Sequence, residues 1–180
     1  MLETIEIETG PQPSACVIWL HGLGADASDF EPVVPELRLP ASKPVRFIFP
    51  NAPQRPVTLN MGMRMRAWYD ILQLGGGAED ETGIRSSQGS IEDLISAETR
   101  KGIPARKIVL AGFSQGCAMA IQTGLRHPEK LAGLLCLSGY VPLHATLAAE
   151  RHAVARRRRS SADCEPAADV GQHCPVPRAH

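Results

Sequence analysis

Residues 107–127 read KIVLAGFSQGCAMAIQTGLRH, and this stretch decides the fold. Residues 107–111 form a short apolar run that predicts a buried strand, whereas the alanine-rich residues 117–127 predict a helix. Between the two, residues 112–116 match the pattern GxSxG. A serine on a sharp turn from strand to helix needs small residues two positions away on either side, because larger ones would clash with the backbone. The stretch therefore predicts a strand, a tight turn that presents Ser114, and a helix.

Four apolar runs predict the strands of one sheet, namely residues 15–21, 45–49, 107–111 and 131–137. Each run is apolar almost throughout, which is the pattern of strands that are buried on both faces of a parallel sheet. Apolar residues at helical spacing over residues 90–101 predict a helix between the second and third of these strands. The alternation of strands and helices predicts an α/β fold with a mostly parallel sheet and helices on both of its faces.

Residues 70–83 read DILQLGGGAEDETG, a combination of consecutive glycines and acidic residues that predicts a mobile surface loop. A phosphate-binding loop is a glycine-rich turn that leads directly from a strand into a helix and usually carries a lysine. This segment has acidic residues in place of the lysine. We therefore do not expect nucleotide binding.

Ser114 is the candidate nucleophile. The turn aims the N-terminus of the following helix at a reacting carbonyl group, so the amide N–H of Gln115 can stabilise a developing oxyanion. GxSxG also occurs in ordinary glycine-serine turns that have no catalytic role. The setting between a strand and a helix favours the catalytic interpretation.

A second glycine-bracketed turn, residues 22–25, follows the first predicted strand. An oxyanion hole needs donors from two different segments, and the amide of Leu23 is the natural second donor. His21 has a competing interpretation as the general base. However, it lies at a strand end just before this turn, whereas the acid and the histidine of such a site follow the serine in the chain. We therefore expect a structural role for His21.

Six motifs together resemble the phospholipase/carboxylesterase family of α/β-hydrolases, which includes bacterial carboxylesterases and acyl-protein thioesterases. They are WLHGLGADASDF (19–30), FPNAP (49–53), MRAWYDI (65–71), GIRSS (83–87), LAGFSQGCAMA (110–120) and LCLSGYVPL (135–143). The motifs occur in the order and with the spacing of that family. The resemblance covers residues 1 to about 150.

This resemblance implies an α/β-hydrolase fold and hydrolysis of carboxylic esters or thioesters of short to medium acyl chains, without a metal or a cofactor. It implies that Ser114 is the nucleophile and that Leu23 and Gln115 supply the amides of the oxyanion hole. It also implies that Trp68 lines the acyl pocket. Cys117 stands where many relatives have glycine, a mild departure that leaves the turn intact.

The family pattern breaks after residue 150. Family members continue with a strand that ends in an HG-then-Asp motif, which provides the triad acid, and with a later segment that holds the triad histidine. Neither is recognisable in this chain, and no apolar strand precedes Asp163 or Asp169. A serine hydroxyl without a base is a poor nucleophile, so we expect impaired activity. The alternative is a noncatalytic truncated remnant, or an acyl-binding or interaction module.

Residues 151–180 differ in composition from the rest of the chain. Arg and Ala are its commonest residues, no aromatic residue occurs, and six basic side chains stand against three acidic ones. Such a segment cannot bury enough apolar surface to offset its ordering entropy, so we predict disorder. We interpret residues 1–150 as a partial α/β-hydrolase domain that lacks the C-terminal strands and helices, and residues 151–180 as a non-family tail. The abrupt change near residues 151–156 is typical of a shifted reading frame.

Composition and charge argue against several classes of protein. The 19 basic and 19 acidic side chains cancel, so the chain has no general attraction for nucleic acid or anionic membranes. No apolar run approaches the roughly 18 residues of a membrane span, and the acidic N-terminus is unlike a signal peptide. We expect a cytoplasmic protein without stable membrane insertion. Its partner would be a small-molecule or acylated-protein ester, and a homodimer is compatible with the sequence.

The 5 cysteines are odd in number and lack paired spacing, which predicts reduced thiols and no metal site. Cys16, Cys117 and Cys136 each lie in an apolar run. We expect these three to be small core residues.

Overall fold

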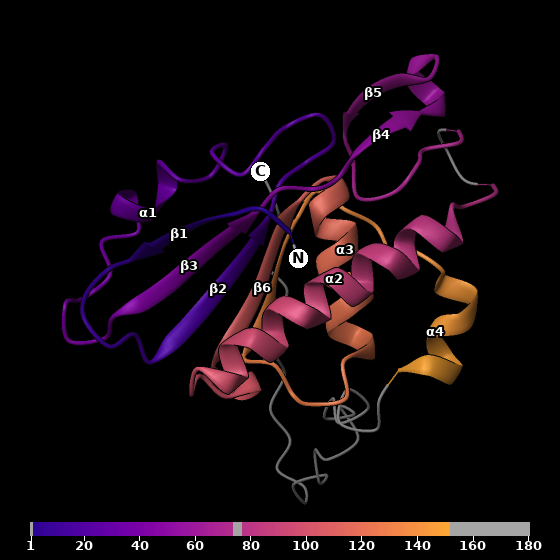
Figure 1. The fold of residues 1–180 in the computed structure, drawn as a ribbon. Helices are drawn as coiled ribbons and strands as arrows, with labels where there is room; N and C mark the ends of the chain where they lie inside the picture. The colour runs from indigo at the N-terminus through magenta and orange to yellow at the C-terminus, as the bar shows by residue number, and fades with distance from the viewer. Residues whose placement is uncertain (1, 74–76, 152–180) are drawn as a thin grey trace, which may run out of the picture.

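The computed structural model describes residues 2–73 and 77–151, which form a central sheet flanked by helices (Figure 1). The strands of the main sheet lie in the order β1-β3-β2-β6-β7, and they are β1 (Thr4–Glu8), β3 (Val45–Pro50), β2 (Ala15–Leu20), β6 (Ile108–Phe113) and β7 (Gly133–Leu137). A separate antiparallel hairpin consists of β4 (Gln54–Val57) and β5 (Met63–Arg66). The α-helices are α1 (Val33–Glu36), α2 (Glu81–Arg100), α3 (Gln115–Arg126) and α4 (His144–Glu150).

The main sheet is parallel except at one edge. β3, β2, β6 and β7 run in the same direction, and β1 pairs with β3 in the antiparallel sense. The register places Leu20 beside Gly112 and Gly112 beside Cys136, so the carboxyl ends of β2, β6 and β7 lie at the same edge of the sheet. In an open α/β sheet, ligands bind in the crevice at this edge.

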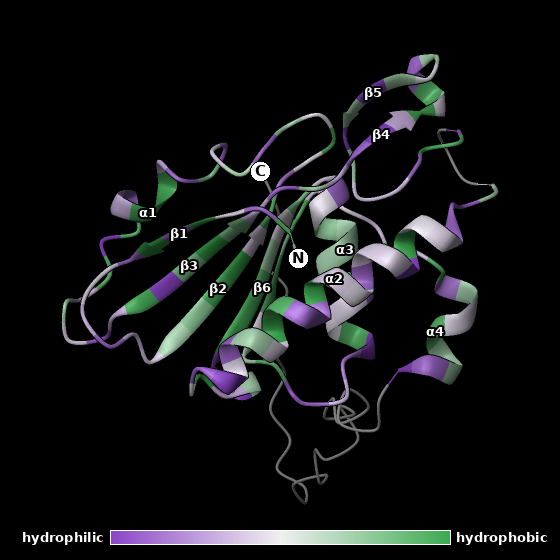
Figure 2. Ribbon diagram, viewed as in Figure 1, coloured by the Kyte–Doolittle hydropathy of each residue, from purple (hydrophilic) through white to green (hydrophobic). Residues whose placement is uncertain are grey.

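Apolar residues fill both faces of the sheet. On one face, Ile91 of α2 and Met119 of α3 belong to a buried cluster that also contains Ile18 and Leu110 of the strands. Figure 2 shows the apolar residues concentrated on the central strands. Full burial of a side chain of this size contributes about 1.5–3 kcal/mol, so this cluster holds the helices to the sheet.

The second face is covered by the segment that contains α1. Trp19 and Phe49 of the sheet pack there against Phe30 and Val34, and the Trp19 and Phe30 rings are stacked with their centroids 5.0 Å apart. Helical elements therefore lie on both faces of a mostly parallel sheet. This confirms the α/β class that the sequence predicts.

All four predicted strands are present as β2, β3, β6 and β7, with ends shifted by one or two residues. The structure adds β1, the β4–β5 hairpin and α4, which the apolar pattern did not indicate. β1 reads TIEIE, in which Ile5 and Ile7 pack against the core while Glu6 and Glu8 alternate with them. Such alternation is typical of an edge strand with one solvent-exposed face.

The expectation of a loop throughout residues 70–83 is wrong at its C-terminal end. Helix α2 begins at Glu81, earlier than residue 90, where the periodicity placed it. The Asp80 side chain accepts a hydrogen bond of 2.9 Å from the amide of Gly83 and so caps the helix. The acidic residues at this point therefore cap and begin a helix. Residues 74–76 of the expected loop lie outside the described part of the chain.

The three described cysteines are free thiols. The expectation of core residues is confirmed for Cys16 and Cys117 but is wrong for Cys136, which is exposed on the edge strand β7. The predicted disorder and the proposed frame shift concern a segment of which all but Arg151 lies outside the described residues.

Candidate active site

Ser114 occupies the sharp turn between β6 and α3, as the GxSxG pattern predicts. Its backbone angles are φ 52° and ψ −116°, a conformation that costs a residue other than glycine about 1–3 kcal/mol. The turn is fixed from both sides, because the Ser114 amide donates to the Leu137 carbonyl at 2.9 Å and the Ser114 carbonyl accepts from the Ala118 amide at 3.1 Å. Strain that the surrounding structure holds in place is a feature of nucleophile turns.

The two glycines of the pattern are required by close backbone contacts. A Cβ atom at Gly112 would lie 2.6 Å from the Cys117 nitrogen, and one at Gly116 would lie 2.5 Å from the His21 carbonyl oxygen. Real Cβ atoms do not approach backbone atoms this closely. Any other residue at these positions would therefore force α3 away from β6 or from the end of β2.

The predicted oxyanion donors lie beside the same turn. A Cβ atom at Gly22 would be 3.6 Å from the Ser114 Cβ, so the turn after β2 touches the turn that carries Ser114. Neither the amide of Leu23 nor that of Gln115 has an acceptor among the residues that the structure describes. Unsatisfied amides at a helix N-terminus and in a neighbouring turn suit an anion or a developing oxyanion.

His21 is buried and both of its ring nitrogens are engaged. Nδ1 donates to the Gly22 carbonyl oxygen at 2.7 Å, and Nε2 accepts from the Ala52 amide at 3.0 Å, which assigns the neutral tautomer. Burial lowers the pKa of His21 below its usual value. The ring has no free nitrogen to accept a proton from Ser114, and it holds the turn after β2 against residue 52.

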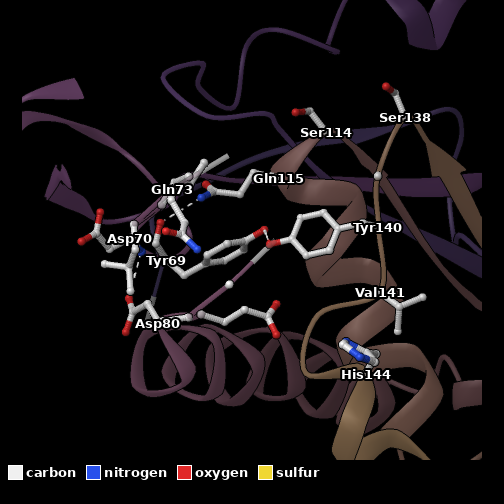
Figure 3. Close-up of a pocket in the computed structure, with 16 residues that line it drawn as sticks. Tyr69, Asp70, Gln73, Asp80, Ser114, Gln115, Ser138, Tyr140, Val141 and His144 are labelled. Atoms are coloured by element: carbon white, nitrogen blue, oxygen red, sulfur yellow. Dashed lines mark hydrogen bonds between the residues drawn. The ribbon is translucent and has the colours of Figure 1, made fainter. Parts of the chain in front are cut away.

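No side chain in the described part of the chain is hydrogen-bonded to the Ser114 hydroxyl. His144 lines the same cavity from the start of α4, but Figure 3 shows it at the other end of the cavity from Ser114. Asp163 and Asp169, which the sequence did not support as the triad acid, lie outside the described residues. The described residues therefore place a candidate nucleophile beside candidate oxyanion donors, and none of them accepts a hydrogen bond from the Ser114 hydroxyl.

A cavity of about 600 Å³ opens beside Ser114 (Figure 3). Its wall is formed by the segment that follows β5, by the start of α2, and by the turn between β7 and α4. The lining residues are Tyr69, Asp70, Ile71, Leu72, Gln73, Gly77, Ala78, Glu79, Asp80, Ser114, Gln115, Ser138, Gly139, Tyr140, Val141 and His144. A concave site with apolar and aromatic walls and a few polar groups is the usual form of a small-molecule site.

Trp68 does not line this cavity. Its side chain is fully buried, and its indole N–H donates to the His21 carbonyl oxygen at 2.9 Å. The next residue, Tyr69, faces the cavity instead. The structure therefore places Trp68 in the core behind the wall, where it supports the turn after β2.

The side chain of Gln115 joins the Ser114 turn to the cavity wall. Its Oε1 accepts from the Trp68 amide at 2.9 Å, and its Nε2 donates to the Tyr69 carbonyl oxygen at 2.8 Å. Gln115 is 3% exposed, so water does not compete for these two bonds. The sequence indicated only the amide of this residue, and no local pattern predicts the role of its side chain.

The carboxylates of the wall are largely engaged in structure. Asp70 accepts from the amide and the hydroxyl of Thr58, and this lowers the pKa of the Asp70 carboxyl against the effect of burial. Within residues 2–73 and 77–151, no group of three His, Cys, Asp or Glu side chains is arranged to hold a metal ion. The same residues include no helix that is long and apolar enough to cross a membrane.

The chain is similar in sequence to curated acyl-protein thioesterases. The chain is 49% identical over 133 residues to acyl-protein thioesterase 1 of Yarrowia lipolytica, a match that covers 72% of this chain and 59% of the relative. It is 44% identical over 164 residues to acyl-protein thioesterase 1 of Mycosarcoma maydis, a match that covers 84% of this chain and 68% of the relative. The chain therefore spans about three fifths to two thirds of the length of these curated relatives.

Solved structures share the fold. Arabidopsis thaliana SOBER1 superposes with a TM-score of 0.73 at 29% identity, over 78% of this chain and 69% of that one. Zea mays acyl-protein thioesterase 2 superposes with a TM-score of 0.71 at 27% identity, over 83% and 67%. A sequence model described as phospholipase/carboxylesterase matches residues 2–166, past the point near residue 150 at which we expected the resemblance to end. The chain therefore belongs to the phospholipase/carboxylesterase family and has the α/β-hydrolase fold.

Proposed function

We propose that the chain is a serine hydrolase that cleaves carboxylic esters or thioesters of short to medium acyl chains through an acyl-enzyme on Ser114. The observation that carries this proposal is the contact between two turns at the carboxyl edge of the sheet. One turn presents Ser114 in a strained conformation, and the amides of Leu23 and Gln115 beside it have no acceptor among the described residues. The cavity next to the serine gives an acyl chain an apolar wall.

In the proposed reaction, Ser114 Oγ loses its proton to solvent water as it bonds to the carbonyl carbon, and the carbonyl π electron pair moves to oxygen. The amides of Leu23 and Gln115 stabilise this oxyanion. When the tetrahedral intermediate collapses, the alkoxide or thiolate leaves with a proton and the acyl group stays on Ser114. Water then releases the carboxylic acid by the same two steps. The names of the curated relatives favour a thioester on an acylated protein as one substrate class.

The serine proton needs an acceptor, and the described residues offer none to Ser114. Loss of one triad member lowers the rate of such a site by about 10⁴-fold. We therefore expect hydrolysis that depends on Ser114 but is slow. The cytoplasmic location and the homodimer stay predictions.

The test is hydrolysis of p-nitrophenyl butanoate, p-nitrophenyl octanoate and an octanoyl thioester by the full chain, with Ser114→Ala as the control. We expect the wild-type chain to exceed Ser114→Ala on at least one of these substrates. Equal rates on all three would contradict the proposal, because background hydrolysis by the protein surface does not depend on one serine.

A second candidate function is an acyl-binding module without turnover. It is favoured by the combination of a formed cavity and a Ser114 hydroxyl that has no base among the described residues. Under this alternative, fatty acids would bind equally well to the wild-type chain and to Ser114→Ala, and neither protein would hydrolyse the esters.

A further inference from the structure

Two tyrosine hydroxyls meet in the cavity. The Tyr69 and Tyr140 oxygens are 2.8 Å apart, although the two residues are 71 positions apart in the chain. Tyr69 is buried, whereas Tyr140 is 50% exposed. Figure 3 shows the two rings end to end, with Ser114 on one side of the pair and His144 on the other. We call this pair the tyrosine bridge.

The Tyr69 side of the bridge is fixed. Gln115 binds the Trp68 amide and the Tyr69 carbonyl, and the Ser87 hydroxyl donates to the Trp68 carbonyl. These bonds hold the backbone next to Tyr69 against both α3 and α2. Its ring therefore has a defined place relative to Ser114.

The Tyr140 side is held more weakly. Tyr140 lies in the turn after β7, where Ser138 has a positive φ of 54° and Gly139 packs against Cys117. Its ring is half exposed, and the bond to Tyr69 is the only hydrogen bond of its hydroxyl to another described residue. Tyr140 is therefore the half of the bridge that can move.

Both hydroxyls stay protonated at neutral pH. Burial raises the pKa of Tyr69, and the bond to Tyr140 raises it further. Burial also raises the pKa of Tyr140. Leaving a hydroxyl without its hydrogen-bond partner in an apolar site costs about 1–3 kcal/mol. An acyl chain that separates the two oxygens must therefore offset this free energy.

We propose that the tyrosine bridge determines how long an acyl chain the cavity accepts. A chain whose carboxyl end lies at Ser114 extends along the wall until it meets the bridge, and further carbons require Tyr140 to swing away. Tyr69 and Tyr140 are thus specificity-determining residues. This inference rests on the proposed function only in that it takes the cavity as the acyl site.

The test measures binding rather than hydrolysis. Saturated carboxylates from butanoate to dodecanoate are titrated into the full chain by calorimetry. Each methylene that enters an apolar site tightens binding by about fourfold, so a plot of affinity against chain length rises and then levels off where the chain meets the bridge. For Tyr140→Ala, we expect the rise to continue for several further carbons.

Two variants control for other effects. Tyr140→Phe keeps the ring but removes the hydrogen bond, and we expect its plateau at an intermediate chain length. Leu135→Ala truncates another half-exposed residue of the same region that does not line the cavity, and its profile should match that of the wild type. Circular dichroism of each variant verifies that it is folded.

A plateau at the same chain length in wild type and Tyr140→Ala would overturn the inference, and so would the absence of binding by every carboxylate. Failure of the proposed function is a separate result. If Ser114 proves unreactive while the plateau still shifts in Tyr140→Ala, the bridge determines chain length in an acyl-binding protein. If Ser114 reacts and the plateau does not shift, the bridge has no such role.

Discussion

The turn that carries Ser114 and the cavity beside it are built in different ways. At the turn, backbone atoms leave no room for a Cβ at Gly112 or Gly116, so the residue type is dictated by contact distance. The cavity wall is instead held by side-chain hydrogen bonds, such as those of Gln115 to residues 68 and 69. The close backbone contacts allow no residue larger than glycine, whereas substitution of a side chain can weaken a hydrogen bond in the wall without displacing the backbone.

This difference predicts that a substitution at the turn lowers the free energy of unfolding the most. Gly116→Val would place a branched side chain against the carbonyl groups of Leu20 and His21, and we expect a loss of more than about 4 kcal/mol in the free energy of unfolding. Chemical denaturation monitored by circular dichroism measures it.

Gly89→Ala is the matched control, because Gly89 lies within α2 and a Cβ there meets no atom within 4 Å. We expect Gly89→Ala to raise the free energy of unfolding by about 0.5–1 kcal/mol, because alanine favours a helix interior more than glycine does. Equal stability of the two variants would show that the close contacts at Gly116 do not constrain the turn.

At the cavity wall, we expect Gln115→Ala to lower the free energy of unfolding by about 2–4 kcal/mol. The change leaves the Trp68 amide and the Tyr69 carbonyl without their partners in a buried place, and each unsatisfied group costs about 1–3 kcal/mol. Denaturant unfolding measures the loss.

Gln115→Glu is the sharper comparison, because its carboxylate can still accept from the Trp68 amide but repels the Tyr69 carbonyl. We expect it to be no more stable than Gln115→Ala. Wild-type stability in both variants would mean that the wall does not depend on this side chain.

The smallest effect concerns the far end of the cavity, where α4 carries His144. Glu150 anchors α4 through Arg85 at 2.5 Å and Arg126 at 2.6 Å, and these bonds lower the pKa of Glu150 from 4.5 to about 2. Because the pKa is lowered in the folded state, this stabilisation is complete above about pH 4.5 and is lost as the pH falls toward 2.

We therefore expect Glu150→Gln to lose about 1 kcal/mol at neutral pH and to equal the wild type near pH 2. Urea unfolding across this pH range provides the measurement. A constant difference at every pH would show that the lost stability comes from packing and not from the ion pairs.

The same contrast explains what the sequence could predict. Strands β2, β3, β6 and β7, the turn at Ser114 and the turn at Leu23 follow from apolar runs and glycine spacing, which are local patterns. The bond between Tyr69 and Tyr140 joins residues that only the folded chain brings together, so no local pattern reveals it. Trp68 was placed on the wall by resemblance, and its neighbour Tyr69 takes that position.

Two elements were missed because their local sequence resembles something else. β1 was missed because its apolar residues alternate with glutamates, which makes it a poor match to a run of buried residues. The early start of α2 was missed because the glycines and acids before it resemble a loop. The signal for this helix start was nevertheless present. Asp80 lies three residues before Gly83, and its side chain accepts a hydrogen bond from the Gly83 amide.

We would test the assignment of Ser114 as a nucleophile beside an oxyanion site with a serine-directed fluorophosphonate probe and mass spectrometry of the full chain. We expect slow labelling, because no base among the described residues activates the serine, with the adduct located on Ser114 and absent from Ser114→Ala. An unlabelled wild-type chain, or labelling that is unchanged in Ser114→Ala, would contradict it.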